Sequence, residues 1–164
     1  MSSPQIFSAI GPAAYRELCS QLVNGVAIAT VTAPGGKPHG LTVSSFTPVS
    51  IEPPLVLVCI DFRCTAVDHF RQEPFFAINI LTEEQRELSV SFAEKPEGRF
   101  EDVDWKPGQT GAPVLTGSLA IIECRLDRVV EVGDHAIIIG HIVAGQTYPG
   151  NPLVYFNRTY RSLR

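Results

Sequence analysis

The chain has 164 residues, a length that suits one domain with a single substantial core. Hydrophobic residues make up 45% and charged residues 18%, which excludes a wholly disordered, collagen-like or coiled-coil chain. The net charge is −4 and the basic residues are scattered, so an extended nucleic-acid-binding face is not expected. We expect one domain over residues 1–164, with residues 1–11 as a flexible N-terminal arm.

Neither a membrane span nor an export signal is evident. No apolar run approaches the roughly 20 residues that a membrane helix needs, and Met1–Gln5 lack the basic-then-apolar pattern of a signal peptide. The expected location is therefore the cytoplasm. Cys19, Cys59, Cys64 and Cys124 form no C-x-x-C pair, so we expect buried, reduced thiols rather than a zinc or redox site.

The first half of the chain predicts one helix followed by strands. Pro12 can open a helix that runs to Leu22, and its apolar stripe is expected to cap a sheet. Short β-rich runs, separated by turn-forming residues, then predict three strands at Val26–Thr32, Leu41–Pro48 and Leu55–Ile60.

The middle of the chain mixes helix and strand signals. We predict a short helix at Thr65–Arg71 and a strand at Phe75–Leu81. Thr82 and Gln85 then form a capping-box pair that opens a second helix. The segment Glu94–Pro113 is expected to be an irregular excursion.

A long hairpin is predicted near the C-terminus. Leu119–Val132 alternates between an apolar face and a polar face, and Glu123 belongs to the polar one. Gly133-Asp134 is a typical hairpin turn, and the arm that follows, Ala136–Ala144, is apolar on both faces. In an antiparallel sheet such an arm needs a cover, for which a partner subunit is the simplest candidate. About seven strands without β-α-β alternation favour a closed or nearly closed barrel.

Several common active sites are excluded by their missing motifs. The chain contains no G-x-G-x-x-G after a strand, no G-x-x-x-x-G-K-[ST] and no G-x-S-x-G. Its four histidines have no metal-type spacing, so no metal site is expected. His141 lies mid-strand among apolar neighbours and is interpreted as a core histidine.

Hydroxyl side chains crowd the predicted strand around residue 45. Thr42, Ser44, Ser45 and Thr47 lie in this run, with Ser50 just beyond it. Hydroxyls both donate and accept hydrogen bonds, so the segment could read the polar edge of a planar heterocycle. A turn whose hydroxyls satisfy its own backbone explains the pattern equally well.

A possible phosphate seat follows the next strand. Arg63 and Thr65 stand at the start of the predicted helix, and a helix N-terminus beside a guanidinium suits a phosphate group. The alternative is that Thr65 is only a helix cap and Arg63 a solvated side chain.

Six motifs occur in order along the chain: Gly25-Val26-Ala27, Pro38-His39-Gly40-Leu41-Thr42-Val43-Ser44-Ser45-Phe46, Glu52-Pro53-Pro54-Leu55-Val56, Phe76-Ala77-Ile78-Asn79-Ile80-Leu81, Gly133-Asp134-His135 and Pro152-Leu153-Val154-Tyr155-Phe156. Together they resemble the short-chain flavin reductases, which are the reductase components of two-component flavin-dependent monooxygenases. The resemblance spans roughly Tyr15 to Leu163, and no single motif carries it alone.

The resemblance implies a mainly β fold, an FMN-binding split β-barrel of Greek-key type with a few short helices, which forms a homodimer. It also implies the reaction: NADH or NADPH reduces a loosely held FMN or FAD by hydride transfer to flavin N5, and the reduced flavin leaves for a separate monooxygenase. In such a reaction the cofactors supply the difficult chemistry and the protein mainly orients them.

The resemblance also implies roles for individual residues. His135 would be the catalytic residue on the nicotinamide side, with Tyr160 as a second contact. The remaining expected flavin contacts are, along the isoalloxazine, Thr42, Val43, Ser44 and Ser45; along the ribityl chain and phosphate, Asp61, Arg63, Cys64 and Thr65; in the flavin wall, Asn79 and Leu81; near the phosphate tail, Phe92, Lys95, Arg99 and Phe100.

Other interpretations stay open. An electron carrier or flavin-storage protein of the same barrel would bind FMN but react poorly with NADH. A pyridoxine-phosphate oxidase-like or heme-binding relative should carry more basic residues or an axial ligand, and a module without a ligand would use the hydroxyl run only as a turn. Asp61-Phe62-Arg63-Cys64-Thr65 departs from relatives that carry Lys and Ser, so FMN cannot be told from FAD; NADH and NADPH are likewise undistinguished.

Overall fold

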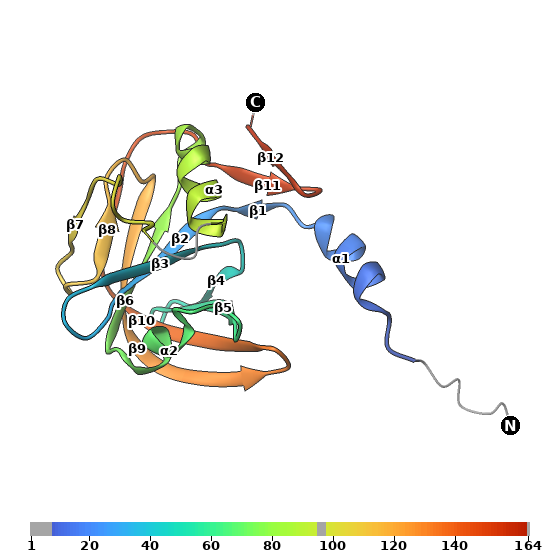
Figure 1. Ribbon diagram of the computed structural model, residues 1–164, viewed down its shortest axis with the longest axis horizontal. Helices are drawn as coiled ribbons and strands as arrows, with labels where there is room; N and C mark the ends of the chain where they lie inside the picture. Colours follow the sequence, from blue (N-terminus) through green and yellow to red (C-terminus); the bar gives the residue numbers. More distant parts are fainter. Residues whose placement is uncertain (1–7, 95–97, 164) are drawn as a thin grey trace, which may run out of the picture.

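The structure, a computed structural model, describes residues 8–94 and 98–163 (Figure 1). The helices are α1 (Pro12–Ser20), α2 (Val67–Gln72), the 3-10 helix η1 (Glu83–Gln85) and α3 (Arg86–Glu94). The strands are β1 (Asn24–Gly25), β2 (Ala27–Thr32), β3 (Pro38–Val43), β4 (Phe46–Ser50), β5 (Leu55–Asp61), β6 (Phe75–Ile80), β7 (Trp105–Pro107), β8 (Pro113–Leu115), β9 (Ala120–Val132), β10 (His135–Thr147), β11 (Val154–Phe156) and β12 (Thr159–Arg161). The arm expected over residues 1–11 falls mostly on residues 1–7, which lie outside the described part.

Seven antiparallel strands form the main sheet, in the order β3-β2-β6-β9-β10-β5-β4. Laid flat, they would place the edge strands β3 and β4 about 29 Å apart. Only two residues separate Val43 from Phe46, however, so these two Cα atoms lie no more than about 11 Å apart. The sheet must therefore curl until its edges meet, which confirms the expected split β-barrel with a few short helices.

The central strand β2 is covered on both faces. Inside the barrel, Ala29 and Val31 pack with buried side chains of β5, β6 and β10, including Val58, Phe76 and Ile138. On its other face, Ile28 belongs to a second cluster formed with α3, β8 and the segment before β11; the further buried members are Val26, Leu81, Phe92, Leu115 and Leu153. These two clusters hold the barrel and its outer layer together.

Two predictions that rest on residues close together in the sequence are confirmed. Val132 pairs with His135, so Gly133-Asp134 is the two-residue turn of the β9–β10 hairpin, with Gly133 at φ 59°. At the start of η1 the Thr82 amide donates to Gln85 Oε1 over 3.1 Å, within a complete capping box. The segment Glu94–Pro113 is less irregular than expected, because its Trp105–Pro107 portion pairs with Pro113–Leu115.

Two predictions about packing and strand length are wrong. The helix α1 forms, but none of its residues is buried, and it stands clear of the barrel instead of capping a sheet (Figure 1). The run Leu41–Pro48 is not one strand: it breaks at Ser44-Ser45 between β3 and β4. The cause is the barrel closure, which requires a corner at that point.

Glu123 also differs from its prediction, since it is only 4% exposed rather than on a wet face. The loop between β7 and β8 folds over it. The amides of Gln109 and Thr110 donate to its carboxylate over 3.0 and 2.7 Å, and the Thr110 hydroxyl donates over 2.6 Å. A Cβ at Gly108 would lie 2.6 Å from the same carboxylate. The buried charge is thus stabilised by donors that are distant from β9 in sequence.

The outer face of the β9–β10 hairpin is apolar and partly open. Ile137 and Ile139 are half-buried, while Val130, Val132 and Val143 are 40%, 54% and 47% exposed. This agrees with the expectation that the doubly apolar arm lacks a cover within one chain. None of the described helices is long and apolar enough to cross a membrane.

The described cysteines are all unpaired, as expected, but only Cys124 is buried. Burial raises the pKa of its thiol to about 12, so it is protonated at neutral pH. Cys59 and Cys64 are half-buried and Cys19 is exposed, which corrects the expectation of four buried thiols.

Candidate functional site

The corner between β3 and β4 uses its hydroxyls to tie the barrel together. The Thr42 hydroxyl donates to the Ser89 carbonyl of α3 over 2.6 Å, and the Ser45 hydroxyl donates to the Cys59 carbonyl of β5 over 2.8 Å. Ser44 is exposed at the apex. Neither hydroxyl satisfies the backbone of its own turn, so the turn interpretation is wrong for Thr42 and Ser45, and each hydroxyl keeps acceptor capacity after donating its own proton.

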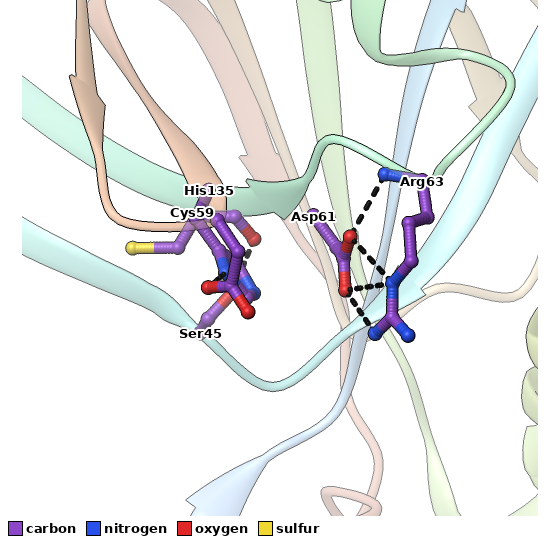
Figure 2. Close-up of polar contacts among 6 residues, drawn as sticks. Ser45, Cys59, Asp61, Arg63 and His135 are labelled. Atoms are coloured by element: carbon purple, nitrogen blue, oxygen red, sulfur yellow. Dashed lines mark hydrogen bonds and ion pairs between the residues drawn. The ribbon is translucent and has the colours of Figure 1, made fainter.

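Asp61, at the end of β5, is held by Arg63. The Arg63 amide donates to Asp61 over 2.8 Å, and its guanidinium nitrogens donate to both carboxylate oxygens over 2.6 to 3.1 Å (Figure 2). These contacts hold the pKa of Asp61 well below its ordinary value. The Arg63 side chain is nevertheless 88% exposed, so this ion pair, called here the Asp61–Arg63 clamp, faces solvent. It fixes the position of the Arg63 side chain.

His135 lies beside this clamp because β10 pairs with β5. His135 is the register partner of Asp61, and directly opposed residues of antiparallel strands point to the same face. Its Nδ1 lies 2.6 Å from Asp134 Oδ1, a contact that lowers the pKa of the Asp134 carboxyl. The His135 side chain is 41% exposed and can meet a ligand.

Ser45, Cys59, Asp61 and His135 thus come together at one end of the barrel (Figure 2). Alternation along β5 puts Cys59 and Asp61 on the face opposite to the buried Val58 and Ile60. This is the same outer face that carries Ile137 on the neighbouring strand. The hydroxyl, carboxylate and imidazole groups therefore line the margin of the open apolar face.

A cavity of about 510 Å³ lies between the beginning of β3 and the loop before β7. Two residues expected near a phosphate tail, Arg99 and Phe100, line it together with Thr65. Arg99 donates from its guanidinium to the Gly40 carbonyl, which fixes the loop against β3. Lys95 lies outside the described residues, so its relation to this cavity stays a prediction.

Sequence reasoning did not single out three other residues of the cavity, Lys37, His39 and Trp105. The His39 ring lies against that of His69 of α2, with ring centroids 4.5 Å apart and an interplanar angle of 40°. Burial, followed by His69 and the cations Lys37 and Arg99, lowers the pKa of His39, so it is mainly neutral at pH 7. The sole tryptophan and the Pro38-His39-Gly40 motif were the sequence signals that could have indicated this cavity. The sequence does not show, however, that the fold brings these two distant segments together.

The predicted helix N-terminal phosphate seat is not formed. Helix α2 begins at Val67 and its N-cap is Ala66, so Thr65 neither caps the helix nor presents its first turn. Arg63 and Thr65 are exposed and Cys64 is half-buried in the turn that leads from β5 to α2. Both of the earlier interpretations of Thr65 are therefore corrected.

Four expected flavin contacts belong to the core. Asn79, Leu81 and Phe92 have no exposed surface and Val43 only 5%. The Asn79 amide group donates to the Ile28 carbonyl and to Thr30 Oγ1, each over 3.1 Å, and its oxygen accepts the Leu115 amide over 2.9 Å. These side chains cannot touch a ligand in this conformation, because their neighbours already cover them.

Tyr160 is placed away from His135. It lies on β12 against α3, where its hydroxyl is 2.9 Å from Ser89 Oγ and its ring lies under the Arg86 guanidinium. The β9–β10 hairpin end that carries His135 and the strand β12 lie at opposite sides of the molecule (Figure 1). Within one chain, the two residues expected to meet the nicotinamide are therefore not brought together.

Residues 19–164 match the model of the flavin reductase like domain. The chain belongs to this family. A Rhizobium meliloti protein named "Probable flavin reductase" is 38% identical over 149 residues, which cover 91% of this chain and 48% of that protein. This family member therefore spans about half the length of that relative.

Two further relatives match over most of their own length. The flavin-dependent monooxygenase reductase subunit HsaB of Mycobacterium tuberculosis is 31% identical over 157 residues, covering 94% of this chain and 83% of HsaB. The solved structure of the Streptomyces globisporus NADH:FAD oxidoreductase SgcE6 in complex with NAD and FAD fragments has a TM-score of 0.88 at 29% identity. That match covers 96% of this chain and 98% of SgcE6.

The buried position of Asn79 predicts a role in folding. Asn79→Ala should lower the free energy of unfolding by about 2 kcal/mol, because it leaves the buried Leu115 amide without its acceptor. Urea denaturation measures this change. Asn151→Ala, which removes an exposed contact with Glu83, is the matched control and should stay within about 0.5 kcal/mol of the wild type. Full stability of Asn79→Ala with lost flavin affinity would restore its expected place in a flavin wall.

Proposed function

We propose that this protein is an NAD(P)H:flavin oxidoreductase that reduces FMN or FAD and supplies the reduced flavin to a separate monooxygenase. Membership in the flavin reductase like family supports the proposal, as do the printed names of HsaB and SgcE6. The observation that supports it most strongly is the row of Ser45, Asp61 and His135 at an open edge of the barrel, together with a cavity lined by Lys37 and Arg99.

The residues present fit a flavin in their chemistry. Exposed Ser44 and the acceptor lone pairs of Ser45 suit the mixed donor and acceptor edge of an isoalloxazine ring. The cations Arg63, Lys37 and Arg99 suit a phosphate group. When bound, the flavin supplies hydride-accepting chemistry at N5, which no side chain of the chain can provide.

The chain's own residues would then bind and orient. Ser44 and Ser45 would fix the edge of the ring, and the Asp61–Arg63 clamp would hold the turn against which the ribityl chain lies. His135, steadied by Asp134, would offer its other ring nitrogen toward the nicotinamide side. No strong general acid is needed, because orientation provides most of the effect in a hydride transfer between two cofactors.

We further propose a homodimer whose contact covers the apolar outer face of the β9–β10 hairpin. The half-buried Ile137 and Ile139 and the exposed stripe of α1, with Tyr15 and Leu18, support this arrangement. The cytoplasmic location stays a prediction from the sequence.

The reaction is tested by following the absorbance of NADH and of NADPH in the presence of FMN, FAD or riboflavin. We expect oxidation of the nucleotide that requires added flavin, with one nucleotide preferred. A protein that holds flavin tightly without oxidising either nucleotide would instead support the electron-carrier alternative. A colourless protein that gains no thermal stability from FMN or FAD would support a module without a ligand.

Ser45→Ala is expected to weaken flavin binding more than folding. The loss of one hydroxyl contact should raise the flavin Kd by about three- to tenfold. Flavin fluorescence measures the Kd, and urea denaturation measures stability. Ser50→Ala removes a hydroxyl that bonds to the Pro53 carbonyl at the other end of β4, and should leave the Kd unchanged. Equal flavin affinity in Ser45→Ala and wild type would contradict the placement of the ring.

The dimer is tested by sedimentation equilibrium. We expect twice the chain mass of 17.9 kDa. Val143→Asp places a charge on the open apolar face and should shift the equilibrium toward the single chain without unfolding it, because Val143 is 47% exposed. A wild-type protein that sediments as a single chain would rule the dimer out.

A further inference from the structure

Phe62 lies between the two members of the Asp61–Arg63 clamp and is also bonded to the neighbouring hairpin. Its amide donates to the Asp134 carbonyl over 3.0 Å, which joins the turn after β5 to the turn that precedes His135. The Phe62 side chain is half-buried and packs against the core of the barrel. One residue therefore links the backbone of the clamp to the backbone that carries the imidazole.

Arg71 of α2 lies over the ring of Phe62. Its guanidinium carbon is 5.8 Å from the centroid of that ring, within the range of a cation–π contact. The same guanidinium donates to Asp68 on its own helix over 3.2 Å and to Glu131 on β9. A guanidinium can place its flat face on an aromatic ring while its N–H groups donate to carboxylates, which the ammonium of a lysine cannot do.

These contacts of Arg71 connect three elements at one end of the barrel: α2, β9 and the turn after β5. The side chains of Asp68 and Glu131 are exposed and that of Arg71 is partly exposed. Ion pairs in such positions contribute little to the stability of the fold. The effect of Arg71 is therefore expected in the placement of the turn around Phe62 rather than in whether the chain folds.

We propose that Arg71 is a positioning residue, which acts through Phe62 to hold the Asp61–Arg63 clamp at a fixed place relative to His135. The inference rests on the proposed function, because the ligands that would span the clamp and the imidazole are a flavin and the nicotinamide docked on it. Hydride transfer needs the reacting atoms of the two rings about 3–3.5 Å apart. A small shift between the two sides of the site therefore matters more for the reaction than for folding.

Amide hydrogen exchange tests the positioning without any ligand. Arg71→Ala should raise the exchange rate of the Phe62 amide about tenfold, because the uncovered ring moves and the bond to the Asp134 carbonyl opens more often. Amides within the β5–β10 ladder should keep their protection. The matched control is Arg128→Ala, since Arg128 bonds only to the adjacent Asp127 among the printed ion pairs, over 2.9 Å, and its loss should leave the Phe62 amide unchanged.

Flavin binding and kinetics test the consequence for the site. Arg71→Ala should raise the flavin Kd, measured by fluorescence, about fivefold and raise the KM for flavin in parallel, while the urea midpoint stays close to that of the wild type. A loss of folded protein would lower the apparent kcat without changing KM, so KM separates positioning from stability. Glu131→Gln keeps the contact between Arg71 and Phe62 but weakens its anchor on β9, and should give a smaller change in the same direction.

A double-mutant cycle tests the route through Phe62. Phe62→Leu keeps an apolar side chain against the core but removes the face on which the guanidinium lies. In this background Arg71→Ala should raise the flavin Kd by less than about twofold, because residues that act through one contact are not additive. Equal increases with and without the Phe62 ring would overturn the proposed route.

The proposal is also overturned by an unchanged exchange rate of the Phe62 amide in Arg71→Ala, by equal effects of Arg71→Ala and Arg128→Ala, or by wild-type flavin affinity despite faster exchange at Phe62. If Arg71→Ala does not fold, wild-type exchange at Phe62 in Glu131→Gln overturns it in the same way. A wild-type protein that neither binds nor reduces flavin would reject the proposed function, while the exchange measurement still decides whether Arg71 holds the turn.

Discussion

A two-residue bend at Ser44 and Ser45 joins the two edge strands of the seven-stranded sheet, and the sheet can satisfy it only by curling into a barrel. The hydroxyls on either side of the bend make the corner stable. Thr42 ties β3 to the Ser89 carbonyl of α3, and Ser45 ties the bend to the Cys59 carbonyl of β5. Because the same corner carries the exposed Ser44, closure of the barrel and presentation of polar groups to a ligand depend on one short segment.

The functional groups gather where this corner meets the β5–β10 pair. Register places His135 opposite Asp61, and the tight hairpin turn places Asp134 against the imidazole. These groups border an apolar outer face that one chain leaves partly open. The proposed exchange of flavin with a partner enzyme would need such an accessible ligand edge, and the proposed homodimer would cover the apolar part of this face.

Buried and exposed polar groups serve different purposes in this fold. Asn79 and Glu123 are covered and fully engaged with backbone donors and acceptors, so they fix the β7–β8 layer against the barrel. Arg63, Ser44 and Lys37 are exposed, and each has room to meet an anion or a ring edge. Residue type alone does not separate the two groups, because each contains side chains that are typical of binding sites.

The sequence by itself determined features whose cause lies within a few residues. The Gly133-Asp134 turn and the Thr82–Gln85 capping box follow from local backbone preferences and local side-chain hydrogen bonds. The ordered motifs likewise indicated the family to which the chain belongs. These signals need no knowledge of distant segments.

Only the tertiary structure decided which residues are covered. Glu123 is buried because a loop from residues 108–112 folds over it, and Phe92 and Asn79 are buried because α3 and β8 pack on β2 and β6. The helix α1 remains exposed for the opposite reason: the Asn157 amide donates to the Ser20 carbonyl at its C-terminal end, but no packing buries any of its residues. The cavity between Lys37 and Trp105 arises in the same way from segments far apart in sequence. Burial depends on contacts between distant segments, and a pattern within one segment cannot contain that information.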